Sequence, residues 1–230
     1  LLVDTRTMAA VALTGSADFF DARIAGQVNA STARRSPGST LKPFIYGLAM
    51  DQGLIHTATV LKDAPTAFGV YSPENFDGRF VGPVSAHDAL IASRNVPAVA
   101  LSARLAQPSL YQFLKSAGVS KMASERHYGL ALALGGGEVS MEELAALYAM
   151  LANGGDFAPL RHLAAEPAAK PLRLLSPEAA FMVRSILADN PRPDGTAAQG
   201  QSVAWKTGTS WGFRDAWSAG IFGHYALVVW

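Results

Sequence analysis

The fold of this chain is organised around the stretch Ser36-Pro37-Gly38-Ser39-Thr40-Leu41-Lys42-Pro43-Phe44. If a helix begins near Ser39, the spacing of Ser39 and Lys42 places both side chains on one face, about one turn apart. Pro43 is compatible with this helix because the first backbone N–H groups of a helix have no intrahelical partner. The apolar run that follows keeps helical spacing up to Gly53, which we interpret as the C-terminal cap.

This helix start also suggests chemistry. A serine hydroxyl is a weak nucleophile until an adjacent base takes its proton, and the Lys42 amine lies within one turn of Ser39. The positive end of the helix dipole stabilises an alkoxide or oxyanion at the same place. Taken alone the signal is weak, because a serine N-cap followed by a surface lysine produces the same pattern. Ser39 and Lys42 are therefore a candidate catalytic pair that needs support from elsewhere in the chain.

Composition limits the possible partners. The chain has 230 residues, is 50% hydrophobic and 16% charged, and has a net charge of +1, so it predicts a globular protein without a basic surface for nucleic acid. It has no cysteine, and its five histidines show no metal-ligand spacing, so we expect no metal and no cofactor. The sequence lacks an initiator methionine, a signal peptide and a long apolar run. We therefore expect a soluble fragment whose anchoring parts lie elsewhere.

Local signals predict the secondary structure. Ser85, the Ser140–Glu143 capping box and Ser176 followed by proline each indicate the start of a helix. Helical patterns also cover residues 96–106 and 109–117, whereas glycine- and proline-rich loops are predicted at 71–83 and 189–200. Strands are predicted at 7–14, 203–209, 216–222 and 225–230. This order predicts a mixed α+β fold for residues 1–230. An antiparallel sheet of about five strands comes from both termini, is flanked by helices and carries a helix-rich lobe.

Two further motifs join the first. Ser93-Arg94-Asn95 follows the helix predicted after Ser85, and Lys206-Thr207-Gly208-Thr209 lies on a predicted strand. Each motif is weak alone, but the ordered trio matches the signature of penicillin-binding proteins and class A β-lactamases. The surroundings of these motifs, including Asn75-Phe76-Asp77-Gly78, Leu134-Gly135-Gly136 and Asp215-Ala216-Trp217, resemble the transpeptidase domain of class A penicillin-binding proteins, most closely the type called 1C.

The resemblance implies roles for the matched residues. Ser39 would be the nucleophile and Lys42 its base, although the ordinary lysine pKa near 10.4 would have to be lowered by burial and by Lys206. Ser93 would carry the proton to the leaving amine, and Asn95 would hold Lys42 or the substrate backbone. The substrate carboxylate would be bound by Lys206, Thr207 and Thr209, with Gly208 allowing close approach. The backbone N–H groups of Ser39 and Thr209 would form an oxyanion hole.

The family implied by this resemblance cross-links peptidoglycan through an acyl-serine formed on a D-alanyl-D-alanine stem peptide and is acylated by β-lactams. The resemblance also implies a parent protein at the periplasmic face of the bacterial inner membrane, with a membrane anchor and a glycosyltransferase domain. Two alternatives stay open: a DD-carboxypeptidase or β-lactamase on the same scaffold, and a non-catalytic penicillin-recognising sensor. The spacing of Glu142 and Glu143 does not match the deacylating segment of class A β-lactamases.

Overall fold

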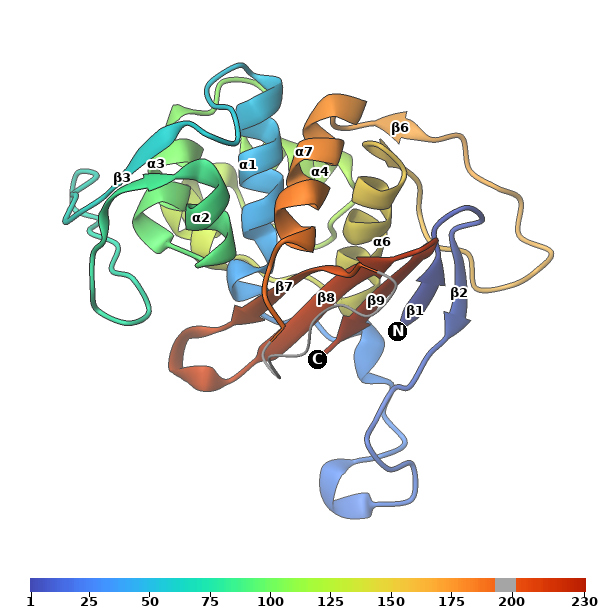
Figure 1. Ribbon diagram of the computed structural model, residues 1–230. Coiled ribbons are helices and arrows are strands. Elements are labelled where there is room, and N and C mark those ends of the chain that lie inside the picture. The colour runs from blue at the N-terminus through green and yellow to red at the C-terminus, as the bar shows by residue number, and fades with distance from the viewer. Residues whose placement is uncertain (193–201) are drawn as a thin grey trace.

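A computed structural model describes residues 1–192 and 202–230 (Figure 1). The main feature of the fold is a five-stranded antiparallel sheet with the order β2-β1-β9-β8-β7. Its strands are β1 (Leu2–Asp4), β2 (Ala9–Ala12), β7 (Ala204–Thr209), β8 (Ala216–Phe222) and β9 (Tyr225–Val229). The pairing of β1 with β9 joins both ends of the chain, so the predicted mixed α+β fold is confirmed. Residues 193–200 of the loop predicted at 189–200 lie outside the described residues.

The first strand differs from its prediction at 7–14. The structure has two short strands, β1 and β2, joined by a turn at residues 5–8. The Asp4 carboxylate accepts hydrogen bonds from the backbone N–H groups of Arg6 (2.9 Å) and Thr7 (3.4 Å), and Met8 has a positive φ of 56°. This aspartate turn reverses the chain before the apolar residues of β2 begin, which is why the extended segment starts later than predicted.

Strand alternation decides which side chains of β7 face the helices. Ala204, Lys206 and Gly208 are buried, whereas Thr207 and Thr209 are exposed. Because successive side chains of a strand point to opposite faces, Lys206 occupies a position of the kind that apolar residues take in β8 and β9. A lysine is thus placed by register in the interior, at the edge strand of the sheet.

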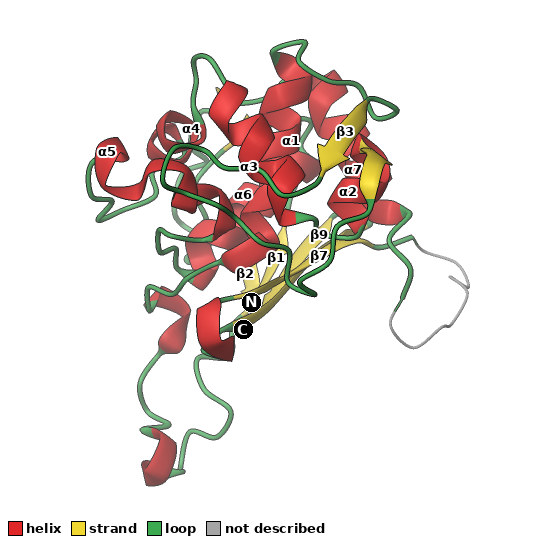
Figure 2. Ribbon diagram, turned by 90° about the vertical axis from the view of Figure 1, so that its left-hand side faces the viewer, coloured by secondary structure: helices red, strands yellow, loops and turns green. Residues whose placement is uncertain are grey.

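One face of the sheet is covered by helices (Figures 1 and 2). Helix α6 (Met141–Ala152) packs on β1, β8 and β9, and α7 (Pro177–Ala188) packs on β7. Helix α1 (Lys42–Asp51) lies beside α7 and packs against α7 and α3 (Asn95–Arg104). Residues 42–50 are buried on every side of α1, as expected of a central helix. The predicted caps Ser140 and Ser176 are confirmed, with Ser140 and Glu143 forming a reciprocal capping box.

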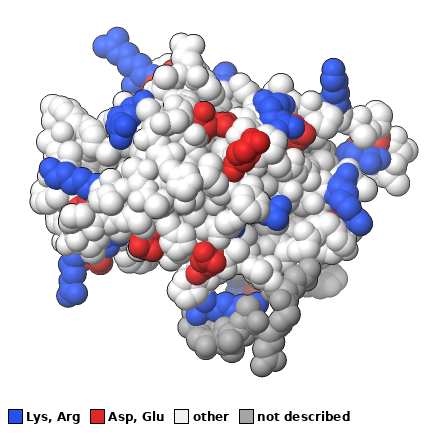
Figure 3. Space-filling model, turned by 45° about the horizontal axis from the view of Figure 1, so that its top comes forward, with Lys and Arg blue, Asp and Glu red and all other residues white. Residues whose placement is uncertain are grey.

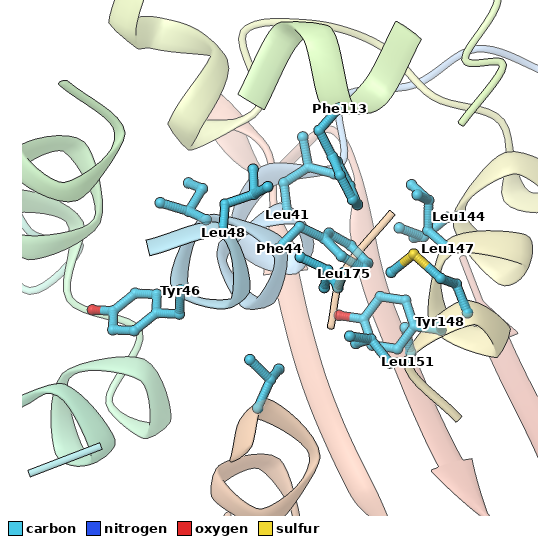
Figure 4. Packing of buried hydrophobic residues seen from close by; sticks show 14 of the residues in the cluster. Leu41, Phe44, Tyr46, Leu48, Phe113, Leu144, Leu147, Tyr148, Leu151 and Leu175 are labelled. Atoms are coloured by element: carbon cyan, nitrogen blue, oxygen red, sulfur yellow. The ribbon is translucent and has the colours of Figure 1, made fainter. Parts of the chain in front are cut away.

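The core joins α1 to its neighbours through aromatic packing (Figure 4). The ring of Phe44 stacks on Phe113 and meets Tyr148 edge to face, each with ring centroids 5.6 Å apart. Such pairs are worth about 0.5–1.5 kcal/mol beyond the area that they bury. The Tyr148 hydroxyl also donates a 3.0 Å hydrogen bond to the Thr40 carbonyl, so α6 contacts the turn that carries Ser39.

The remaining elements form the helix-rich lobe and its connections. Ser85 caps α2 (Ala86–Ile91) as predicted, since its side chain accepts a hydrogen bond from the Asp88 N–H. The β3–β4 and β5–β6 pairs are short antiparallel ladders that the sequence patterns did not predict. The remaining strands are β3 (Val60–Asp63), β4 (Gly82–Ser85), β5 (Asp156–Phe157) and β6 (Leu172–Arg173), and the remaining α-helices are α2 (Ala86–Ile91), α4 (Leu110–Ser116) and α5 (Glu125–Tyr128). The 3-10 helices are η1 (Ala22–Ile24), η2 (Ala30–Thr32), η3 (Gly38–Leu41), η4 (Gly129–Leu134) and η5 (Trp211–Phe213).

The surface carries charges of both signs. On the face shown in Figure 3, basic and acidic side chains are scattered over a largely uncharged surface. Within the residues that the structure describes, none of the helices has the length and apolar character needed to span a membrane.

Candidate active site

Ser39 lies in the 3-10 helix η3, directly before α1 begins at Lys42. Side chains three positions apart eclipse one another in a 3-10 helix, so this local geometry places Ser39 and Lys42 on the same side. Pro43 occupies the first turn of α1, as the sequence predicted. The C-cap is Gln52, and Gly53, which was predicted as the cap, follows it with φ of 67°. Ser39 is half-buried, and its N–H lies in a first turn, where no intrahelical partner exists.

The turn around Ser39 is enclosed by three glycines. A Cβ added to Gly208 would lie 2.7 Å from Thr40 Cγ2 and 2.9 Å from Thr40 N, and one added to Gly38 would lie 2.8 Å from Thr209 N. A Cβ on Gly135 would lie 2.7 Å from Gly38 Cα. The end of β7 and the η3–α1 turn are therefore in backbone contact. The sequence predicts that Gly208 allows the close approach of a bound peptide, whereas in the structure the side of Gly208 that lacks a side chain faces this turn.

Two hydrogen bonds hold the segment before Ser39 in place. The indole Nε1 of Trp217 on β8 donates to the Ser36 carbonyl at 2.9 Å. The Ser36 hydroxyl donates to the Gly135 carbonyl at 2.7 Å. The turn is thereby connected both to the sheet and to the helix-rich lobe.

Gly208→Ala is expected to destabilise the fold by about 1–3 kcal/mol, because the new methyl group would overlap backbone atoms that cannot move independently. Gly220→Ala on the neighbouring strand is the matched control, since its Cβ would meet its nearest neighbour, Val203 Cγ1, at 3.4 Å, an ordinary contact distance. Thermal unfolding should show a lower Tm for Gly208→Ala and little change for Gly220→Ala. Equal Tm values for the two variants would contradict the enclosed turn.

Lys42 is completely buried and is surrounded by acceptors. Its ammonium donates to the Ser93 carbonyl, to Asn95 Oδ1 at 2.6 Å and to the Ser93 hydroxyl at 3.3 Å. Burial lowers the pKa of Lys42 well below its ordinary value, and the positive charges of Lys206 and Arg94 lower it further, while Asp63 opposes them. The site therefore makes the loss of a proton from Lys42 easier than it is for a lysine in water.

Lys206, on strand β7, also donates a hydrogen bond to the Ser93 hydroxyl. Its Nζ donates to Ser93 Oγ at 2.8 Å and to the Thr207 carbonyl at 3.0 Å. Burial lowers the pKa of Lys206 to about 8. The Ser93 hydroxyl thus accepts from two amines that come from α1 and β7.

Ser93 occupies the junction between α2 and α3 in a left-handed conformation, with φ of 56°. The Ser93 N–H donates to the Leu90 carbonyl and the Arg94 N–H to the Ala89 carbonyl, the pattern of a Schellman C-cap. Glycine is the usual residue at this position, because a side chain in the left-handed region costs about 1–2 kcal/mol. The serine therefore occupies a strained position, where its hydroxyl accepts hydrogen bonds from Lys42 and Lys206.

This strain predicts a difference between two variants that both lack the hydroxyl. Ser93→Gly should be more stable than Ser93→Ala by about 1 kcal/mol, because only glycine adopts the left-handed conformation without cost. Urea unfolding of the two proteins measures this difference. A Ser93→Ala protein that is as stable as Ser93→Gly would show that the positive φ carries no strain.

Most of the predicted site residues come together. Lys42, Ser93, Asn95 and Lys206 form one hydrogen-bonded cluster, and Thr207 and Thr209 lie exposed on the edge strand beside it. The Ser39 hydroxyl makes no hydrogen bond to residues 1–192 or 202–230, so the direct bond to Lys42 that the spacing suggested is not formed in this state. Lys42 instead donates hydrogen bonds to the carbonyl of Ser93 and to the amide oxygen of Asn95.

Sequence reasoning missed the residues that support this cluster. Trp217 and Gly135 stood within matched segments, but their contacts with the Ser39 turn were not predicted. Asp63 had no signal, because a single aspartate in a short strand resembles a surface residue. Asp215, in another matched segment, accepts a 3.1 Å hydrogen bond from Trp230 Nε1.

Two exposed aromatic rings are in contact with each other. Phe76, from the loop after β3, meets Phe213, from η5 after β7, with ring centroids 5.6 Å apart and nearly perpendicular planes. This contact joins a loop of the helix-rich lobe to the end of the sheet's edge strand.

Comparison with known proteins agrees with this geometry. The family profile described as "Penicillin binding protein transpeptidase domain" matches residues 1–217. Penicillin-binding protein 1C of Escherichia coli (strain K12) is 39% identical over 233 residues, which cover 100% of this chain and 30% of that protein. Penicillin-binding protein 1A of Neisseria cinerea is 31% identical over 246 residues, covering 95% of this chain and 30% of that protein. The chain thus spans 30% of the length of these curated relatives.

A solved structure shares the fold. The crystal structure of a peptidoglycan glycosyltransferase from Burkholderia ambifaria matches with a TM-score of 0.80 at 20% sequence identity, covering 99% of this chain and 79% of that one. At this identity the match concerns the fold alone. The family profile and the similarity to penicillin-binding proteins 1C and 1A confirm the resemblance stated from the motifs: the chain belongs to the penicillin-binding protein transpeptidase domain family.

Proposed function

We propose that this domain is a peptidoglycan DD-transpeptidase, which forms an acyl-serine on Ser39 and passes the acyl group to an amine of a second stem peptide. The observation that carries the proposal is the buried amine of Lys42, which lies beside a second buried cation and within hydrogen-bond distance of Ser93 and Asn95. Family membership supports an enzyme of the serine acyltransferase kind.

The contacts of Lys42 indicate how it acts as a base. An ammonium has three N–H donors, and Lys42 directs them at the Ser93 carbonyl, the Ser93 hydroxyl and Asn95 Oδ1. The neutral amine keeps two donors and gains a lone pair, so loss of a proton releases one acceptor. The lone pair then accepts the proton of the Ser39 hydroxyl, one turn away, as this oxygen attacks.

In the acylation step, Ser39 Oγ forms a bond to the carbonyl carbon of the penultimate D-alanine, and the bond to the nitrogen of the last D-alanine breaks. Ser93 supplies the proton that this nitrogen needs. Its oxygen already accepts from Lys206 at 2.8 Å and from Lys42 at 3.3 Å, so its own O–H is free to donate to the leaving group. The proton that Lys42 took from Ser39 replaces it.

The edge strand binds the substrate. Thr207 and Thr209 point to the exposed face of β7, where their hydroxyls, together with the charge of Lys206, bind the terminal carboxylate. The N–H groups of Ser39 and Thr209 belong to segments in backbone contact through Gly38 and Gly208, and they receive the oxyanion. One such donor is typically worth about 3–4 kcal/mol in the transition state.

In the second step an amine of another stem peptide attacks the acyl carbon and gives up a proton to Lys42. The bond from the acyl carbon to Ser39 Oγ breaks, and Lys42 returns this proton to Ser39 Oγ, which restores the serine hydroxyl and the neutral amine. Water is the competing acceptor. Glu143 accepts from the Ser120 and Ser140 N–H groups at 2.8 Å each, and Glu142 accepts from the Ser31 hydroxyl at 2.9 Å. Both carboxylates are thus engaged at the start of α6, which disfavours the β-lactamase alternative and predicts a long-lived acyl-serine.

By analogy with the class A relatives, the parent protein would be anchored at the periplasmic face of the bacterial inner membrane and carry a glycosyltransferase domain. Its partners would be peptidoglycan stem peptides ending in D-alanyl-D-alanine, and β-lactams would acylate it as mimics of that end.

The test uses the full-length protein with a fluorescent penicillin and, separately, with a D-alanyl-D-alanine peptide and an amine acceptor. We expect a stable label on the peptide that contains Ser39, located by mass spectrometry, and a new amide product. Rapid penicillin hydrolysis would instead identify a β-lactamase. Hydrolysis of the donor peptide without transfer would identify a carboxypeptidase, and a stable label without any peptide reaction would identify a sensor.

The pH dependence of acylation provides a further prediction. The rate constant for the acylation of Ser39 by a penicillin should fall as pH rises through about 8, because Lys206 loses the charge that binds the carboxylate of the penicillin. Lys206→Arg should react more slowly but lose this alkaline decline, since arginine stays protonated. Stopped-flow rates from pH 6 to 10 test this, and an unchanged decline in Lys206→Arg would assign it to another group.

A further inference from the structure

Asp63, at the end of β3, is a buried carboxylate with every oxygen engaged. Its Oδ1 accepts from Asn75 Nδ2 at 2.7 Å, and its Oδ2 accepts from Arg94 Nε at 2.8 Å and from the Val81 N–H at 3.1 Å. The side chain of Asp63 has no solvent exposure, so protein groups alone satisfy its charge. Burying a carboxylate costs desolvation free energy, so we expect a buried charge of this kind to have a specific role.

Arg94 connects this carboxylate to the Ser93-Arg94-Asn95 turn. The guanidinium is buried, and besides Asp63 it contacts Asp77 at 3.0 Å and the Arg79 carbonyl. The side chain of the middle residue of the motif thus points away from the reacting groups and is fixed in the loop at residues 75–81.

Asn75 makes a second connection. Its Oδ1 accepts from the Asn95 backbone N–H at 2.7 Å, and its Nδ2 donates to Asp63 and to the Arg79 carbonyl. The neighbouring Glu74 carbonyl accepts from Asn95 Nδ2 at 2.7 Å, which leaves Asn95 Oδ1 facing Lys42. The loop therefore determines the orientation of the Asn95 amide.

We propose that Asp63 and Asn75 are positioning residues that hold the Ser93-Arg94-Asn95 turn against Lys42. Through Arg94 and the Asn95 N–H, they stabilise a turn in which Ser93 has a left-handed backbone, a conformation that persists only where the surroundings enforce it. The inference rests on the proposed function and adds to it two residues that do not touch the substrate.

The hydrogen-bond count explains why a carboxylate is needed. Three N–H donors converge on Asp63, and a carboxylate has only acceptors. An asparagine has one acceptor oxygen and one NH2 group, so in either orientation the NH2 group would face a donor. Asp63→Asn should therefore release the turn while leaving the size of the side chain unchanged.

The experiment measures acylation by a fluorescent penicillin in full-length Asp63→Asn and Asn75→Ala. Rapid kinetics separate the acylation rate constant per labelled site from the initial binding constant and from the labelled fraction. We expect the rate constant per site to fall about 10–100-fold, because small misplacements of reacting groups have effects of this size. Binding should change little, since Lys206, Thr207 and Thr209 are untouched. Asn75→Ala keeps the pair of Asp63 and Arg94 and carries the test if Asp63→Asn does not fold.

The matched control is Asp156→Asn, which breaks an exposed aspartate–arginine pair with Arg173 on the β5–β6 ladder. It should leave the rate constant unchanged. A purely structural role would lower the labelled fraction in Asp63→Asn and Asn75→Ala without changing the rate constant per site, and this result would overturn the inference. A native protein without label on Ser39 would overturn the proposed function, and this inference with it.

Discussion

Ser39→Ala is expected to remain folded and to form no covalent adduct with a fluorescent penicillin. Its rate of acylation should be too low to detect. The expected result follows from the chemistry, because the Ser39 oxygen is the atom that becomes acylated and no neighbouring group can replace it. The fold should be nearly unaffected, since the half-buried hydroxyl makes no hydrogen bond to the described residues. Gel fluorescence and intact mass measure the adduct, and circular dichroism measures the fold.

Ser116→Ala is the control, because Ser116 is an exposed serine at the end of α4. It should be labelled at the native rate. A label that persists in Ser39→Ala, or that maps to another residue in the native protein, would refute the assignment of the nucleophile.

Lys42→Met is expected to lower the acylation rate constant by a factor of about 10²–10⁴, the usual contribution of a general base. Methionine has nearly the volume of lysine and suits a buried position, but it removes the lone pair that accepts the Ser39 proton. It also leaves the Ser93 carbonyl and Asn95 Oδ1 without their donor. Stopped-flow acylation at pH 7 to 9 measures the loss, and the labelled end point shows whether Ser39 is still accessible.

Lys170→Met provides the comparison, since Lys170 is an exposed lysine in the segment before β6. Its rate constant should equal that of the native protein. If Lys42→Met stayed within about tenfold of native, below the usual effect of a base, the proton acceptor would have to be another group, and Lys206 would be the next to test.

The helices and strands followed largely from local signals. Ser85, Ser140 and Ser176 each cap a helix through their own side chains, and Pro43 and Gly53 stand at the two ends of α1. Such contacts link residues a few positions apart, so their pattern is visible in the sequence. The ladders β3–β4 and β5–β6 were missed because each depends on pairing across a loop.

By itself, the sequence determined the sheet drawn from both ends of the chain, the placement of Ser39 and Lys42 on one helical turn, and the trio of motifs. Only the tertiary structure decided that Lys42 bonds to Ser93 and Asn95, that Gly208 packs on the Ser39 turn, and that Asp63 holds Arg94. These contacts join residues 31 to more than 100 positions apart, as between Asp63 and Arg94 and between Thr40 and Gly208. Their energies arise from burial and from hydrogen bonds that exist only once the lobes pack together, so no local pattern encodes them.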